Sequence, residues 1–254
     1  MAQGRRAIEL FLALGAAAGL AVGCGPALHG GAGGEGGEGG ESSHAMAGDT
    51  GSAVSYAAGL GLMQGHLLVA KELIAQGRAA DAEPHLAHPA DELYPDLEPE
   101  LTRRGAPPFR EKLTVLPDLI RTAPAAPATG QAVEEAGRSI DRALAVLPEQ
   151  ERRDPAFVVP VIRQLLDTAA SEYDASITDG RIAETVEYQD SRGFVLYAEQ
   201  LFRGIAPQLA SSDPALERRL ADTFAALKPA WPGPLPPARP LLSAQTVRER
   251  VAAL

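Results

Sequence analysis

The stretch DPAFVVPVIRQLLDTAASEYDASITDG, residues 154–180, carries both a start signal and a stop signal for a helix. Asp154 can cap a helix N-terminus, and Pro155 suits the first helical position because its missing N–H would be unpaired there anyway. The apolar run that follows predicts a helix through Ile177 that stops near Gly180. This segment therefore predicts one long helix that is bounded at both ends by its own sequence.

The same Asp-Pro pair recurs at residues 213–214 and predicts a second capped helix. Its apolar stripe consists of Leu216, Leu220, Phe224 and Leu227. Residues that start or stop helices are frequent from residue 53 onward, whereas the alternation of apolar and polar residues that is typical of strands is nearly absent. The further helices that we expect cover residues 53–76 before Gly77, residues 80–103 before Gly105, a short stretch between Pro108 and Pro117, residues 133–147 and residues 183–209.

The C-terminal part differs in composition. PAWPGPLPPARP, residues 229–240, contains too many prolines for a helix, so we expect an extended segment with Trp231 as its anchor. SAQTVRERVAAL, residues 243–254, then predicts a last helix. Together these patterns predict an all-α antiparallel helical bundle of about seven helices, with a proline-rich extended segment before the last helix.

The N-terminus has the pattern of an export signal. Arg5 and Arg6 precede the apolar run LFLALGAAAGLAVG, which is short and rich in alanine and glycine for a membrane span. The sequence LAVGC, residues 20–24, resembles the lipobox of bacterial lipoproteins, and Cys24 is the only cysteine among 254 residues. We therefore predict a lipoprotein signal peptide over residues 1–23 and a lipid on Cys24, which would leave no thiol for other chemistry.

A glycine-rich segment separates Cys24 from the predicted helical domain. GGAGGEGGEGGESS, residues 30–43, has too few apolar side chains to offset the entropy of ordering, so residues 24–52 are predicted to form a flexible tether. Gly25, rather than aspartate, follows the cysteine and favours sorting to the outer membrane. We expect the helical domain, residues 53–254, at the periplasmic face of a bacterial membrane. His29 and His44 are interpreted as tether residues rather than as metal ligands.

Charge and motif content narrow the function. The formal net charge of −10 argues against nucleic acid as a partner. The sequence contains no GxSxG elbow, HExxH pair or phosphate-binding loop, which argues against an enzyme of those classes and indicates no organic cofactor.

HLAHPADELY, residues 85–94, carries the strongest hint of a binding site. His85, His88 and Glu92 are spaced at i, i+3 and i+7, so they share one side of a continuous helix. If Pro89 instead opens a new helix, both histidines lie in the preceding turn and are exposed. In a continuous helix that turns back at Gly77, His66 reaches a similar height. The four side chains then suit Zn²⁺, Cu²⁺ or Fe²⁺ rather than Ca²⁺.

EYQDSRGFVLYAEQL, residues 187–201, predicts a second acidic cluster. Phe194, Tyr197 and Leu201 define a core-facing stripe, and one turn upstream the same stripe reaches Asp190 and Glu187. Carboxylates on an inward face need a cation, a donor cluster or a metal. The alternative is that the stripe surfaces before residue 190 and that both acids are solvated.

Three stretches carry a resemblance to known proteins: GLMQGHLLVAKEL, EPHLAHPADELYPDL and DGRIAETVEYQDSRGFVLYAEQL. Over roughly residues 59–205 they resemble a group of largely uncharacterised bacterial envelope proteins. More remotely, the lipidated helical domain is similar to imelysin-type periplasmic proteins, which are linked to iron uptake. The His-x-x-Glu pair typical of imelysins is absent at His66, and Glu72 falls on a different side of that helix.

Two functional hypotheses remain open. The first is a membrane-anchored periplasmic lipoprotein that handles or senses a transition metal. The second is a helical adaptor or scaffold that binds another envelope protein or peptide. In both hypotheses the lipid on Cys24 supplies the contact with the membrane.

The lipobox generates a direct test. Replacing Cys24 with serine should abolish lipid attachment, because only the cysteine sulfur is acylated. We expect the wild-type protein to sediment with bacterial membranes and the Cys24→Ser variant to accumulate as a soluble or unprocessed form. Cell fractionation followed by immunoblotting measures this, and identical fractionation of the two proteins would exclude the lipoprotein assignment.

Overall fold

The computed structural model describes residues 52–254. The predicted signal peptide, Cys24, His29, His44 and the tether lie outside the described residues. The described part is all-α, as predicted, but it has eleven α-helical segments rather than about seven, because short helices divide several of the expected runs. These segments are α2 (Ala53–Ala75), α3 (Ala79–His88), α4 (Tyr94–Arg103), α5 (Arg110–Thr114), α6 (Leu116–Thr122), α7 (Pro127–Leu144), α8 (Glu149–Arg153), α9 (Pro155–Ala175), α10 (Thr185–Ser212), α11 (Pro214–Leu227) and α12 (Ala244–Ala252).

The residues predicted to cap or end helices do so in the structure. The Asp154 carboxylate accepts a hydrogen bond of 2.9 Å from the Ala156 N–H and caps α9. Asp213 caps α11 in the same way, through a bond of 3.0 Å from the Leu216 N–H. Gly77 and Gly105 follow α2 and α4 with φ of 73° and 68°, the left-handed conformation that ends a helix.

A small hairpin replaces the predicted end of α9. The helix stops at Ala175 rather than at Ile177, because the chain then forms two short antiparallel strands, β1 (Ile177–Thr178) and β2 (Arg181–Ile182). Asp179 and Gly180 form the connecting turn with φ of 52° and 69°. Two consecutive residues with positive φ are typical of a tight hairpin turn, and aspartate followed by glycine suits it.

Helix α3 continues through Pro89 into α4. His88 keeps helical angles, φ −52° and ψ −42°, although it precedes a proline. The segment η1 (Pro89–Leu93) is a π-helical turn in which the Tyr94 N–H donates to the Pro89 carbonyl, five residues back. The wider turn begins at the Pro89 carbonyl, so it lies on the C-terminal side of the proline and leads into α4. The hypothesis of a continuous helix is confirmed, and a new helix beginning at Pro89 is wrong.

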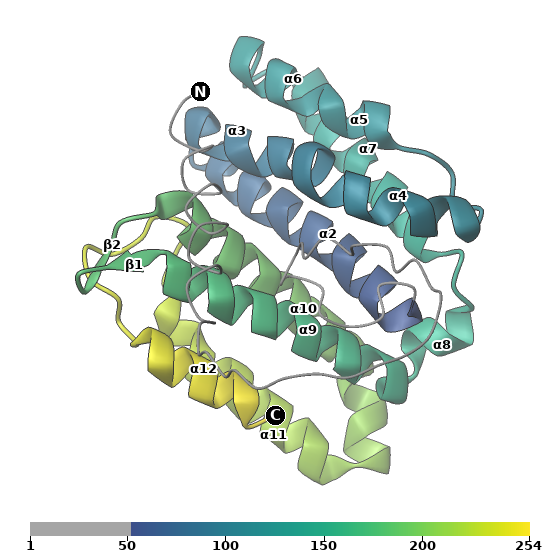
Figure 1. Ribbon diagram of the computed structural model, residues 1–254, viewed down its shortest axis with the longest axis vertical. Coiled ribbons are helices and arrows are strands. Elements are labelled where there is room, and N and C mark those ends of the chain that lie inside the picture. The colour runs from purple at the N-terminus through teal and green to yellow at the C-terminus, as the bar shows by residue number, and fades with distance from the viewer. Residues whose placement is uncertain (1–51) are drawn as a thin grey trace, which may run out of the picture. The chain divides into compact units, whose positions relative to one another are not determined.

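Helix α2 lies between the α3–α4 run and the α9–α10 pair and contacts both (Figure 1). Within residues 52–254 it is the one helix long and apolar enough to cross a membrane by length and composition alone, yet 78% of its most apolar window is buried inside the bundle. Its apolar composition is therefore explained by a position in the core of the described domain.

The α2 and α10 backbones touch where two glycines cross. A Cβ atom added to Gly193 would lie 2.3 Å from the Gly65 carbonyl oxygen, and one added to Gly65 would lie 2.7 Å from the Phe194 ring. Only glycine leaves space for such an approach. His66 follows Gly65 directly, and Asp190 lies one turn before Gly193, so the crossing brings these two residues into the same layer.

Residues 231–242, here called the strap, connect the 3₁₀ turn η2 (Lys228–Ala230) with α12 and lie against α10. The predicted anchor is confirmed, because Trp231 is buried and its indole Nε1–H donates to the Ser191 hydroxyl at 2.7 Å. Tyr188 donates to the Gly233 carbonyl at 3.0 Å, and Arg192 donates to the Trp231 carbonyl at 2.8 Å. The strap is thus fastened to the first turns of α10.

The glycine crossing can be tested with one pair of variants in α10. Gly193→Ala should destabilise the protein by about 3 kcal/mol, because the new methyl group collides with the α2 backbone and the helices must separate. Gly204→Ala is the matched control, since a Cβ there meets no atom within 4 Å. It should be neutral or stabilising by about 0.5–1 kcal/mol. Urea unfolding measures both, and equal effects would contradict the packing argument.

Candidate metal centre

Three histidines from two helices converge on one aspartate from a third. His66 lies on α2, His85 and His88 lie one turn apart at the end of α3, and Asp190 lies in the second turn of α10. His85 is fully buried, and His66 and Asp190 are 4% and 5% exposed. The side chain of His88 retains 24% of its exposure and forms the open edge of the group.

The Asp190 carboxylate is the common partner of the three rings. Its Oδ1 lies 2.6 Å from His85 Nδ1 and 2.7 Å from His66 Nδ1, and its Oδ2 lies 3.3 Å from His88 Nδ1. All three histidines therefore bring the same ring nitrogen, Nδ1, close to one carboxylate. Three of these side chains, His66, His85 and Asp190, place one ligand atom each within 4.8 Å of the others, as a metal site requires.

The Nδ1 atom of His66 has no hydrogen-bond partner. It is close to Asp190 Oδ1, but the orientation of the ring does not allow a hydrogen bond along that 2.7 Å separation. Among the described residues it is the one buried side-chain nitrogen or oxygen left unpaired. Buried polar atoms are normally paired, so an exception inside a group of potential ligands indicates a place for a cation.

The charges of the group are set by burial and mutual contact. Burial alone would raise the pKa of Asp190, but its close contacts with His66 and His85 hold it well below its usual range. Burial lowers the pKa of His66, although the Asp190 carboxylate acts against this shift. The centre thus combines an ionised carboxylate with an imidazole that favours its neutral form, which is the form that binds metals.

Carboxylates surround the open edge beside His88. Glu92 Oε1 lies 3.9 Å from His88 Nε2. Burial and the charges of Asp190 and Glu187 raise the pKa of Glu172 to about 8, and burial also raises the pKa of Glu187. Although burial alone would lower it, the hydrogen bond and charge of Asp190 raise the pKa of His88 to about 9. Carboxyl groups that hold their protons more tightly than usual therefore gather beside a His88 ring that favours its charged form.

The structure arranges the residues predicted from the sequence differently from the two expected groups. His66, His85 and His88 lie together, whereas Glu92 is exposed and borders the group only through His88. Asp190 and Glu187 do not form a separate acidic cluster, because Asp190 lies among the histidines and Glu187 is half-buried at the edge. Asp190 supplies the carboxylate that the sequence assigned to Glu92, because α10 packs directly against α2 at Gly65.

Sequence reasoning did not identify Gln189. This residue is buried, and its side-chain Oε1 lies 2.9 Å from His85 Nε2, while its Nε2 donates to the Pro234 carbonyl at 3.0 Å. No motif marks this glutamine, and its place next to Asp190 in the chain is the only available hint.

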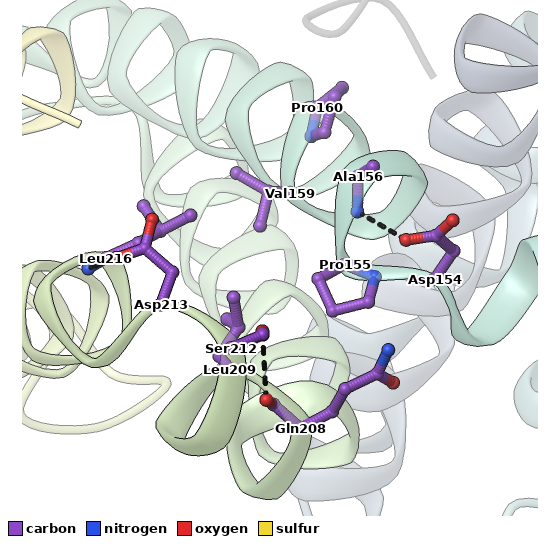
Figure 2. Close-up of a pocket in the computed structure, with 10 residues that line it drawn as sticks. All are labelled: Asp154, Pro155, Ala156, Val159, Pro160, Gln208, Leu209, Ser212, Asp213 and Leu216. Atoms are coloured by element: carbon purple, nitrogen blue, oxygen red, sulfur yellow. Dashed lines mark hydrogen bonds between the residues drawn. The ribbon is translucent and has the colours of Figure 1, made fainter.

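A pocket elsewhere on the domain is unrelated to this group. Figure 2 shows it between the start of α9, the end of α10 and the start of α11. Its two carboxylates, Asp154 and Asp213, already accept hydrogen bonds from the N-termini of their own helices. The remaining lining is mainly apolar, so the pocket offers no converging set of ligand groups.

The C-terminal part of the chain is similar to a known family. Residues 148–254, less than half of the chain, match the model of the iron permease-associated 4-helix bundle domain. The match supports a helical bundle similar to a domain associated with iron permeases, rather than an imelysin-type protein as the sequence suggested. No curated protein and no solved structure matches the chain.

The matched region contains only part of the metal centre. It covers α8 to α12 and includes Asp190 and Gln189, whereas His66, His85 and His88 precede it. The carboxylate therefore comes from the family-like bundle, and the three imidazoles come from the α2–α3 hairpin.

The buried position of Asp190 predicts a large effect on stability. In chelator-treated protein, Asp190→Ala should lower the free energy of unfolding by about 3 kcal/mol, because it leaves buried imidazoles without their common acceptor. Glu187→Ala, three residues earlier on the same helix, should change it by less than about 1 kcal/mol. Urea unfolding near pH 7 compares the two variants, and a loss below about 0.5 kcal/mol for Asp190→Ala would contradict its role as the common partner.

Proposed function

We propose that the protein binds a transition-metal ion between His66, His85, His88 and Asp190 and handles this ion in metal uptake. The unpaired Nδ1 of His66 carries the proposal, because it is a buried polar atom 2.7 Å from an ionised carboxylate that two further imidazoles share. A metal ion satisfies that nitrogen and replaces the protons that otherwise separate Asp190 from the rings.

The ligand set restricts the kind of ion. Imidazole nitrogens with one carboxylate suit Zn²⁺, Cu²⁺ and Fe²⁺, whereas Ca²⁺ and Mg²⁺ prefer six or more oxygen ligands. The three Nδ1 atoms and one carboxylate can supply four ligands. The similarity of residues 148–254 to an iron permease-associated domain supports iron as the physiological ion.

The surroundings of the centre favour capture and release over permanent storage. His88 and the carboxyl groups of Glu92, Glu172 and Glu187 line the accessible side of the buried ligands. An approaching cation would favour the ionised forms of these carboxyl groups, which could then act as its counter-charges. His88 is the most exposed member of the group, so we expect an ion to enter and leave past it.

The proposal includes the anchoring predicted from the sequence. A lipid on Cys24 would hold the domain at the periplasmic face of a bacterial membrane. Gly25, which follows the cysteine, favours the outer membrane. The family description names an association with iron permeases, and we propose an iron-transport protein as the partner to which a bound ion passes.

Calorimetric titration tests the metal centre. Metal-free full-length protein near pH 7 should bind Zn²⁺, Cu²⁺ or, without oxygen, Fe²⁺ with micromolar or tighter affinity. Asp190→Asn and His85→Ala should weaken this binding roughly 100-fold or more, because the first replaces the carboxylate with a neutral amide and the second removes an imidazole ligand. Since bound metal displaces protons from the imidazoles, the affinity should also fall as the pH is lowered below neutrality.

The matched control for this titration is Asp141→Asn. Asp141 is an aspartate on α7 that accepts a hydrogen bond of 2.8 Å from Gln64 and lies outside the metal centre. The Asp141→Asn variant should bind metal as tightly as the wild type does. Wild-type protein that binds none of the three ions, or binding that is indifferent to Asp190 and His85, would exclude this function and favour the helical adaptor.

A further inference from the structure

A chain of buried hydrogen bonds connects the strap to the metal centre. The Gln189 Nε2 atom lies 3.0 Å from the Pro234 carbonyl oxygen, and Gln189 Oε1 lies 2.9 Å from His85 Nε2. Both Gln189 and His85 are buried, at 1% and 0% exposure, so water does not compete for these bonds.

The direction of the chain is fixed by its end. A backbone carbonyl can only accept a hydrogen bond, so the NH₂ group of Gln189 must face Pro234 and its oxygen must face His85. An amide oxygen can likewise only accept. His85 Nε2 therefore carries a hydrogen, and Nδ1 is the one ring nitrogen that is able to bind a metal.

The same nitrogen faces Asp190. His85 Nδ1 lies 2.6 Å from Asp190 Oδ1, a separation that two bare lone pairs do not tolerate. Nδ1 is thus the nitrogen that a metal ion shared with Asp190 would bind, while the hydrogen on Nε2 stays bound to Gln189. The histidine is thus prepared for metal binding without a change of its hydrogen bond to the glutamine.

The acceptor at the end of the chain is held in place by its neighbours. Tyr188 donates to the Gly233 carbonyl, Arg192 to the Trp231 carbonyl and Trp231 to Ser191, all within 3.0 Å. Arg192 is itself fixed by Glu72 of α2 through bonds of 2.6 and 2.8 Å. These contacts leave the Pro234 carbonyl little freedom to move away from Gln189.

We propose that Gln189 is a positioning residue of the metal centre, which together with the Pro234 carbonyl fixes His85 in the tautomer that presents Nδ1 to the ion. This inference rests on the proposed metal-binding function and assigns it a second layer of residues from the strap. Such outer hydrogen bonds to a ligating histidine fix the orientation of the ring and raise its basicity.

The test compares two variants that each remove hydrogen bonds to the strap. Gln189→Met keeps a similar length but cannot accept from His85 or donate to Pro234. Tyr173→Phe removes the bond of 2.9 Å from the Tyr173 hydroxyl to the Leu242 carbonyl, at the far end of the strap. Zn²⁺ affinity of the full-length protein should fall about 10- to 100-fold in Gln189→Met and stay within about twofold of the wild type in Tyr173→Phe.

A second measurement separates positioning from stability. Proton–nitrogen NMR spectra of the zinc-loaded wild type should show a slowly exchanging hydrogen on His85 Nε2 and none on Nδ1. In Gln189→Met this hydrogen should exchange faster or move to the other nitrogen, whereas Tyr173→Phe should keep the wild-type signal. The urea midpoints of both variants show whether a loss of stability accompanies either change.

The possible results discriminate between the two proposals. Wild-type protein that does not bind Zn²⁺, Cu²⁺ or Fe²⁺ overturns the proposed function and this inference with it. Wild-type binding that is unchanged in Gln189→Met, or weakened equally in both variants, overturns the inference alone and leaves the metal centre standing. A hydrogen found on His85 Nδ1 in the zinc-loaded protein also overturns it.

Discussion

The contact between the α2 and α10 backbones at Gly65 and Gly193 is the constraint on which the rest of the domain depends. No side chain fits between the two helices there, so their separation and their relative height are fixed within narrow limits. His66 and Asp190 lie beside this contact, so their relative positions are fixed by it. The α3–α4 run then packs against α2 and adds His85 and His88 to the same layer. Two glycines thus determine where a polar group of four residues is assembled.

That polar group lies where an ordinary bundle has apolar side chains. Burying an ionised carboxylate is costly, and replacing buried ion pairs with apolar residues is often neutral or stabilising. The domain has instead surrounded Asp190 with three imidazoles and has left one nitrogen of His66 unpaired. Violations of core chemistry of this kind concentrate at functional sites. The proposed cation would account for the unpaired nitrogen, the shared carboxylate and the acidic open edge together.

The centre also joins two parts of the chain, of which only the C-terminal one is similar to a known family. The bundle of residues 148–254, which is similar to an iron permease-associated domain, contributes Asp190, Gln189 and the strap. The α2–α3 hairpin contributes the histidines. A change in the packing of these parts would alter the ligand set directly. Metal binding at this junction would in turn stabilise their association, because the ion binds only the assembled form.

The sequence by itself determined the helices and most of their ends, since caps such as Asp154 and Asp213 and stops such as Gly77 act through neighbouring backbone atoms. It also indicated His66, His85 and His88 as one group, because the i, i+3 spacing and the turn at Gly77 are local features. Only the tertiary structure decided that Asp190, rather than Glu92, is the carboxylate next to them and that Gln189 contacts His85 Nε2. These partners are about a hundred residues apart in the chain, and no periodicity shows which helices will be neighbours. The π turn at Pro89 was likewise settled by packing, because a proline in isolation favours ending the helix before it.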